Sequence, residues 1–404
     1  MRPKIKTSVL VVIGCGVVVG GWWSWQRLTS RLTAGPMVQR VGRSGFVVVW
    51  RTAEAGGGRL VVMDGDRVVM RVPARLEGDQ YVASAMGLAS GHVYAYEIWQ
   101  VTDSGERKLG GPWRCKTNEG PSGSFRLVGF GDSGTGSWGQ YRLARQMAGH
   151  RPDLIIHTGD LVYKRGEARD YPSKFFEPYA SMLTSVGFMP VMGNHDYVTE
   201  RGRPLLDTFV LPQNGPKGTD AERHYWFDYG CARFAAIDSN VTEAELQGRV
   251  SPWLLEVFGS AGDRWRFAYF HHPPYTCCTK RGGNKGVLDN LVPALEASGV
   301  DVVFCGHNHL YERSKPILAE AVAADGIVYI VTGAGGARLY AAKPKGERPA
   351  YTAVAYDEDL SFTLVDASPG ALLLQQIDVK GQVVDRWELQ RGMRSGATGK
   401  IQRR

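Results

Sequence analysis

Residues 125–134 read FRLVGFGDSG, a short apolar run that ends in glycine and aspartate. Four further polar motifs follow apolar runs in the same manner: GDLVY at 159–163, GNHD at 193–196, HHP at 271–273 and GHNH at 306–309. Short apolar runs bounded by glycine or proline are typical of buried strands. Each motif is therefore expected just beyond the end of a strand.

The runs before the five motifs predict strands at 125–130, 154–156, 188–192, 267–270 and 302–304. Helical patterns lie between some of them, at about 140–148, 173–183 and 287–297. Strands that alternate with helices indicate an α/β layer fold. In such sheets ligands collect beyond the carboxyl ends of the strands, so motifs far apart in the sequence are expected to converge.

The motifs carry a set of side chains that suits metal ions. They offer two carboxylates, a phenol, an amide and several imidazoles. Carboxylate oxygen is a hard ligand, whereas imidazole suits zinc and iron. The set includes no thiolate, so a structural zinc site of the cysteine type is not indicated. Oxygen and nitrogen donors of this kind fit two metal ions held side by side.

The five blocks in this order resemble the calcineurin-like metallophosphoesterases and, more narrowly, the purple acid phosphatases. Tyr163, which follows Asp160 by three residues, resembles the purple acid phosphatase branch, and so does YER at 311–313. The likeness covers roughly residues 40–389. It implies an α/β fold in which a metallophosphoesterase β-sandwich is flanked by helices.

The resemblance also implies a ligand set for each of two ions. An Fe³⁺ ion would be held by Asp132, Asp160, Tyr163 and His309. The second ion, Fe²⁺, Zn²⁺ or Mn²⁺, would be held by Asp160, Asn194, His271 and His307, with Asp160 bridging. His271 is favoured over His272 because the family's ligand lies two residues before a proline.

The function implied is that of a binuclear phosphoesterase, which hydrolyses phosphate monoesters by attack of a metal hydroxide, as acid phosphatases do. His195 would lie outside the metal shell, contact the phosphoryl group and assist the leaving oxygen. A phosphodiesterase with the same centre is one alternative. A surface-anchored binding protein with a vestigial site is another.

One departure from the family pattern concerns the loop after the HHP motif. The family usually has a further histidine there, whereas residues 275–284 read YTCCTKRGGN. Lys280 or Arg281 is the candidate for offering positive charge to a phosphate in its place. His272 is a candidate for contacting substrate or for holding the loop by hydrogen bonds. The identity of the leaving-group acid is left open.

Short alternating runs precede the motif region, at 46–50, 59–63, 67–72 and 93–101. Several short strands at regular spacing predict a β-sandwich. This part resembles the fibronectin type III-like domain that precedes the catalytic domain in many larger purple acid phosphatases. The predicted divisions are 36–117 for this domain and 124–390 for the metallophosphoesterase domain, with a Gly-, Ser- and Pro-rich linker between them.

The amino-terminal residues 1–35 are predicted to be a membrane anchor or signal segment. Arg2, Lys4 and Lys6 precede an uncharged apolar run at 9–23, a pattern of targeting segments. Basic residues on this side predict a cytoplasmic amino terminus and an exported body, periplasmic or at the cell surface. An uncleaved anchor is favoured, and a cleaved signal and a lipidated Cys15 are the alternatives.

The composition is ordinary for a globular protein, with 43% hydrophobic and 22% charged residues among 404. A formal charge of +8 can attract anionic substrates, but the lysines and arginines form no continuous block that would indicate nucleic-acid binding. The basic tail at 391–404 is predicted to be disordered. Neither the oligomeric state nor any disulfide pairing follows from the sequence.

Overall fold

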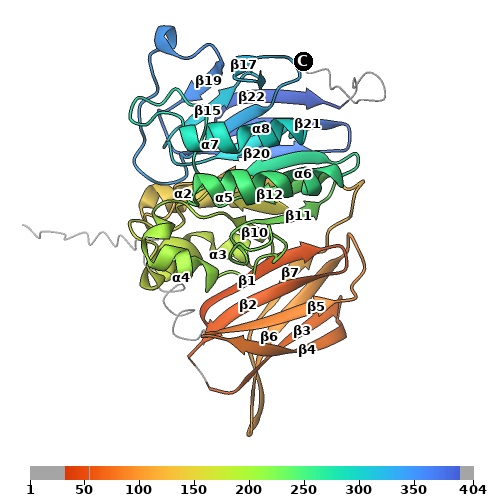
Figure 1. The fold of residues 1–404 in the computed structure, drawn as a ribbon. Coiled ribbons are helices and arrows are strands. Elements are labelled where there is room, and N and C mark those ends of the chain that lie inside the picture. Colours follow the sequence, from red (N-terminus) through yellow and green to blue (C-terminus); the bar gives the residue numbers. More distant parts are fainter. Residues whose placement is uncertain (1–31, 54, 392–404) are drawn as a thin grey trace, which may run out of the picture.

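A computed structural model describes residues 32–53 and 55–391. The predicted anchor or signal run and tail residues 392–404 lie outside this described part. Figure 1 shows an all-β region at the bottom, formed by β1–β7, and an α/β region above it. Within the described part, no helix has both the length and the apolar character that crossing a membrane requires.

The all-β region has seven strands in the order β1-β2-β5-β4-β3-β6-β7. Their bounds are β1 Leu32–Gly42, β2 Gly45–Thr52, β3 Gly57–Asp64, β4 Arg67–Glu77, β5 Gln80–Met86, β6 Val93–Thr102 and β7 Gly105–Lys116. The start of β4 pairs with β3 and its end pairs with β5, so β4 belongs to both layers. Trp50, Leu60 and Tyr96 are buried in the core that these strands enclose.

The α/β region contains two larger sheets. The first has the order β10-β9-β8-β20-β21-β22 and the second β11-β12-β13-β14-β18-β15-β19. The first sheet comprises β8 Phe125–Phe130, β9 Leu154–His157, β10 Gly187–Pro190, β20 Ser361–Ala367, β21 Ala371–Asp378 and β22 Val383–Gln390. The second comprises β11 Tyr225–Tyr229, β12 Ala232–Ala236, β13 Trp265–Tyr269, β14 Val302–Cys305, β15 Tyr311–Ser314, β18 Val328–Thr332 and β19 Thr352–Tyr356. The short strands β16 Ile317–Leu318 and β17 Ala321–Val322 pair with each other.

Helices cover the outer faces of these two sheets. Their bounds are α2 Trp138–Gly149, α3 Glu177–Leu183, α4 Arg203–Leu206, α5 Glu243–Glu245, α6 Ser251–Gly259, α7 Lys285–Asn290 and α8 Val292–Ala297. Leu143 of α2 and Met182 of α3 are buried with the first sheet. Leu254 of α6 and Leu295 of α8 are buried with the second sheet. This is the α/β architecture that the resemblance predicted.

The central strands of both sheets run parallel, so their carboxyl ends meet at one edge. β8, β9 and β10 are parallel neighbours in the first sheet. β12, β13, β14 and β18 are parallel neighbours in the second. The motifs begin directly after β8, β9, β10, β13 and β14, and the strand predictions there are confirmed to within about three residues.

The all-β region is joined to the first sheet through β1. Gln39 is fully buried; its Nε2 donates to the Phe188 carbonyl at 3.2 Å, and its Oε1 accepts from the Val210 amide at 2.7 Å. In the predicted linker, Asn118 is buried and accepts from the amide of Gly230 at 3.0 Å. The linker is therefore anchored to the α/β region rather than free.

Candidate metal centre

The first group of donor atoms surrounds the phenol oxygen of Tyr163. Tyr163 lies in the turn after β9. This oxygen lies 3.0 Å from Asp160 Oδ2, 3.2 Å from Asp132 Oδ1 and 3.1 Å from His309 Nε2. His309 Nε2 lies 3.4 Å from Asp132 Oδ1. Residues from three motifs thus present four donors to one small space.

The second group lies beside the first and centres on the Asn194 amide. Asn194 Oδ1 lies 2.8 Å from His307 Nδ1 and 3.1 Å from His271 Nε2. The same His271 nitrogen lies 3.6 Å from Asp160 Oδ2. The Asp160 carboxylate therefore borders both groups, as a bridging ligand must.

These separations fit metal coordination. Ligand atoms about 2.1 Å from one shared ion lie roughly 3 to 3.5 Å from each other, and the donor atoms of the two groups lie 2.8 to 3.6 Å apart. Asp132, Asp160 and His271 are fully or almost fully buried, and their ligand atoms lie within 4.8 Å of one another. The donor chemistry and the spacing together fit two cations.

The backbone is constrained where it delivers the ligands. Asp132, Asp160 and His307 have φ values of 57°, 58° and 68°. Residues with a Cβ seldom adopt this left-handed conformation, and it concentrates at functional sites. A Cβ on Gly193 would lie 2.1 Å from Asp160 Oδ1, so glycine is needed there to let the strand end approach the shared carboxylate.

Backbone carbonyls orient two of the imidazoles. His271 Nδ1 donates to the Thr158 carbonyl and His309 Nδ1 donates to the Arg338 carbonyl, both at 2.8 Å. Each bond fixes the proton on Nδ1 and leaves the Nε2 lone pair directed into the centre. A hydrogen bond of this kind is what commonly sets the tautomer of a metal-binding histidine.

The surroundings shift the pKa values of Asp132 and His307 toward the forms that bind cations. Burial opposes ionisation of Asp132, but its bonds and charge interactions with His309 and His271 overcome burial and lower its pKa. The pKa of His307 is lowered by burial and by the neighbouring His271 and His272. A lowered pKa keeps an imidazole neutral, which is the form that binds metals.

Two known protein families match the part of the chain that carries these donors and the part that follows it. The profile described as "Calcineurin-like phosphoesterase" matches residues 125–311, and the profile described as "Iron/zinc purple acid phosphatase-like protein C" matches residues 326–386. The chain belongs to the purple acid phosphatase-like branch of the calcineurin-like metallophosphoesterases. This family implies a binuclear metal centre.

The relatives of this metallophosphoesterase share only about a quarter of its aligned residues. "Probable inactive purple acid phosphatase 24" of Arabidopsis thaliana is 25% identical over 292 residues, which cover 60% of this chain and 44% of the relative. The "Nucleotide pyrophosphatase/phosphodiesterase" of Hordeum vulgare is 24% identical over 344 residues, 70% of this chain and 87% of the relative. The chain thus spans less than half the length of the Arabidopsis protein.

Solved structures support the fold of the metallophosphoesterase. The purple acid phosphatase PPD1 from yellow lupin (Lupinus luteus) seeds matches with a TM-score of 0.76 at 19% identity, covering 88% of this chain and 74% of that one. A structure of PhoD matches with a TM-score of 0.66 at 13% identity, covering 91% and 90%.

The metallophosphoesterase places His195 at the edge of the centre. Its backbone amide donates to Asp160 Oδ1 at 2.8 Å, and its Nδ1 donates to the Lys164 carbonyl at 2.7 Å. The half-buried ring lies 4.6 Å from that of Tyr163. This arrangement leaves Nε2 available for a substrate oxygen, which suits the role predicted for His195.

The remaining predicted contacts lie on the His307 side. His272 Nδ1 and Ser239 Oγ are 2.9 Å apart, and the His272 and His307 rings lie 4.5 Å apart. His272 therefore holds its loop by a hydrogen bond while bordering the centre. The Arg281 Nη1 atom lies 2.6 Å from His307 Nε2. Lys280 lies farther out, with Nζ 4.0 Å from the centre of the Tyr340 ring.

Asp196 is a supporting residue that the sequence reasoning missed. Its buried carboxylate accepts from the amides of Leu161, Val162 and Gly193. Burial and the nearby Asp160 raise its pKa to about 7, against the effect of these amides. It ties the turn after β9 to the turn after β10. Its place as the last residue of the GNHD motif was the signal that could have revealed it.

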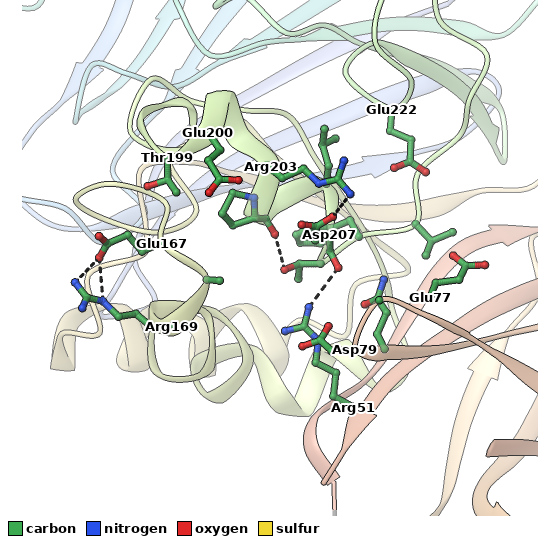
Figure 2. A pocket seen from close by; sticks show the side chains of 18 of the residues that line it. Arg51, Glu77, Asp79, Glu167, Arg169, Thr199, Glu200, Arg203, Asp207 and Glu222 are labelled. Atoms are coloured by element: carbon green, nitrogen blue, oxygen red, sulfur yellow. Dashed lines mark hydrogen bonds and ion pairs between the residues drawn. The ribbon is translucent and has the colours of Figure 1, made fainter. Parts of the chain in front are cut away.

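A second charged region lies where the all-β and α/β regions meet (Figure 2). This cleft has a volume of about 1070 Å³. Four of its arginines pair with carboxylates of the cleft: Arg203 with Asp207 at 2.7 Å, Arg51 with Asp79 at 3.1 Å, Arg75 with Glu77 at 3.0 Å and Arg169 with Glu167 at 2.6 Å. None of the residues predicted for the metal centre lines it.

Proposed function

We propose that the protein is a binuclear metallophosphoesterase that hydrolyses phosphate monoesters. The observation that carries the proposal is the Asp160 carboxylate shared between two groups of donor atoms. A single metal site needs no such sharing, whereas a pair of ions that clamps one phosphate does. The family assignment supports the same chemistry.

Each group of donors would hold one ion. Fe³⁺ is proposed beside Tyr163, with Asp132, Asp160 and His309, because phenolate and carboxylate are hard ligands that suit a trivalent ion. Fe²⁺, Zn²⁺ or Mn²⁺ is proposed beside Asn194, with Asp160, His271 and His307. When bound, the ions supply positive charge to the phosphate oxygens and activate the attacking water.

The protein contributes orientation and proton transfer. His195 Nε2 would donate a hydrogen bond or proton to the leaving oxygen, because its Nδ1 is already bound to the Lys164 carbonyl. Asp196 would hold two ligand-bearing turns in register. The imidazoles of His271 and His309 would be held in one tautomer by their carbonyl partners.

A phosphodiesterase with the same centre is the second candidate. The similarity to the Hordeum vulgare protein, whose name includes phosphodiesterase, favours it. A binding protein with a vestigial site is disfavoured by the complete donor set. For the all-β region we propose a fibronectin type III-like domain. For the whole chain we propose export and anchoring through the amino-terminal segment.

The test is metal analysis combined with a visible spectrum and paired assays. The proposal expects two metals per chain, an absorption band from Tyr163 bound to Fe³⁺, and faster turnover of an aryl phosphate monoester than of the matching diester. Faster turnover of the diester would select the second candidate. No turnover of either ester in protein that carries its metals would select a vestigial site.

A further inference from the structure

A sixth polar segment lies at the carboxyl end of a parallel strand, and none of the five motifs includes it. The residues that follow β12 read IDSN at 237–240. β12 runs parallel to β13, the strand that leads into the HHP motif. Because the carboxyl ends of parallel neighbours share one edge of the sheet, the segment at 238–240 lies beside the proposed ligands.

On one side the 238–240 segment holds the turn that carries Asn194. Asn240 Nδ2 donates a hydrogen bond to the Met192 carbonyl at 3.1 Å, and Met192 lies two residues before Asn194. The same nitrogen donates to Asp238 Oδ1 at 2.8 Å. The Asp238 carboxylate therefore orients the amide that binds this turn.

On its other side the 238–240 segment holds the turn that carries His271. Ser239 Oγ accepts a hydrogen bond from the His272 amide at 3.1 Å and lies 2.9 Å from His272 Nδ1. His272 follows His271 directly in the chain. One three-residue segment thus links the two turns that bring Asn194 and His271 to the second group of donors.

A buried arginine fixes the segment in place. The Arg223 side chain is only 6% exposed, and its Nη1 lies 3.2 Å from Oδ2 of the fully buried Asp238. Its Nη2 donates to the Arg201 carbonyl at 2.6 Å, and its Cζ lies 5.4 Å from the centre of the Tyr197 ring. Because Arg201 and Tyr197 follow the GNHD motif closely, Arg223 ties the segment to the chain just beyond Asn194.

The first group of donors is oriented by other atoms. His309 Nδ1 donates to the Arg338 carbonyl at 2.8 Å, and Asp132 Oδ2 accepts from the His307 amide at 2.8 Å. Neither of these bonds involves Arg223 or the 238–240 segment. A change in this cluster should therefore reach the second group of donors first.

We propose that Arg223 and the 238–240 segment are positioning residues that set the affinity of the second ion site, separately from the ion beside Tyr163. This inference rests on the proposed function, because it requires two ions. Asp238 is the central member, since it is bonded to both Arg223 and Asn240. Residues that orient metal ligands typically change metal affinity by about 10- to 100-fold when they are replaced.

The test measures Zn²⁺ binding by equilibrium dialysis and elemental analysis in Arg223→Met, Asp238→Asn and Asn240→Ala, after removal of the divalent ion. Each variant should bind Zn²⁺ about 10- to 100-fold more weakly than the unchanged protein. The absorption band from Tyr163 bound to Fe³⁺ should persist, and excess Zn²⁺ should restore most of kcat. Arg223→Lys, which keeps the charge beside Asp238, should recover part of the affinity. Asn240→Ala leaves the buried ion pair intact, so it tests the inference even where loss of that pair prevents folding.

A second buried arginine provides the matched control. Arg233 lies near the amino end of β12, its side chain is also 6% exposed, and its Nε lies 2.7 Å from Asp228 Oδ1. This end of the strand is opposite the edge that carries the proposed ligands. Arg233→Met and Asp228→Asn should lower the melting temperature, as the Arg223 and Asp238 variants do, but leave the affinity for Zn²⁺ unchanged.

Three results would overturn the inference. Unchanged Zn²⁺ affinity in all three variants would show that the cluster does not position ligands. Loss of the absorption band together with the second ion would show that it supports the whole centre. An equal loss of Zn²⁺ affinity in Arg233→Met would assign the effect to general destabilisation. The proposed function fails differently: the unchanged protein itself would hold fewer than two metals and cleave no ester.

Discussion

The metal centre and the charged cleft are both rich in ionisable side chains, yet they differ in how those charges are balanced. In the cleft, Arg203 and Arg51 pair with Asp207 and Asp79 (Figure 2). In the centre, the carboxylates of Asp132 and Asp160 face a phenol and imidazoles, and no lysine or arginine pairs with either of them in the described chain.

The difference shows that the volume of a cleft does not by itself identify an active site. The cleft has a volume of about 1070 Å³, but most of its arginines already pair with carboxylates beside them. In the centre, Asp132, Asp160 and His271 are buried while Asn194 and His307 are only partly buried, and cations between these donors would balance the charge of the carboxylates. Buried donors that converge without a counter-charge identify the reactive place.

The largest expected effect is from Asp160→Asn, which removes the charge shared by both metal sites. Activity should fall on the order of 10³-fold, and metal content should drop below two per chain. The matched control is Asp207→Asn in the cleft, which should keep activity and metals. Elemental analysis and turnover of an aryl phosphate measure both. Full metal content in Asp160→Asn would show that Asp160 does not bridge.

His195→Ala should affect turnover without affecting the metals. Because proton transfer by a positioned side chain contributes about 10² to 10⁴-fold, kcat should fall at least about 10²-fold. Elemental analysis should still find two metals per chain. Loss of both ions would instead make His195 a ligand, and the division between metal shell and substrate contact would be wrong.

Tyr163→Phe tests the ion beside the phenol. The visible absorption band should disappear, because phenylalanine has no oxygen to bind Fe³⁺, and activity should fall about tenfold or more. Spectra of both proteins at equal iron content provide the measurement. An unchanged colour would show that Tyr163 is a packed aromatic and not a ligand.

The smallest effect is expected in the cleft. Arg203→Ala removes a solvent-exposed pair with Asp207, and such pairs contribute about 0 to 1 kcal/mol. Thermal unfolding should therefore change little, and kcat/KM for an aryl phosphate should be unchanged. A large loss of activity would mean that the cleft takes part in the reaction, so its paired charges would not be merely structural.

Much of the fold could be predicted because the motif strands are short, apolar and bounded by glycine. The strand predicted at 125–130 is β8, and the one predicted at 302–304 is β14. The helix predicted at 287–297 is divided into α7 and α8 at Leu291, since Pro293 has no amide hydrogen to continue the ladder.

Other elements could not be read from the pattern. β1 and β7 each contain a proline, glycines and polar residues, so their apolar alternation is weak. In the site, the pairing of Asp160 with both donor groups followed from the family resemblance and not from spacing. The role of Asp196 depends on three backbone amides, two from the turn after β9 and one from the turn after β10, which no local pattern reveals. The ligand assignment itself stays a prediction until metals are measured.

The buried Gln39 has a consequence for dissecting the molecule. β10 is the outermost strand of the first sheet, and β1 packs against it through Gln39. Starting a truncated chain near residue 117 would uncover the apolar flank of β10 and leave the Phe188 carbonyl unpaired. Exposed strand edges associate with other chains, so the α/β region expressed alone should precipitate or self-associate. The all-β region therefore covers an edge that the α/β region cannot leave exposed to water.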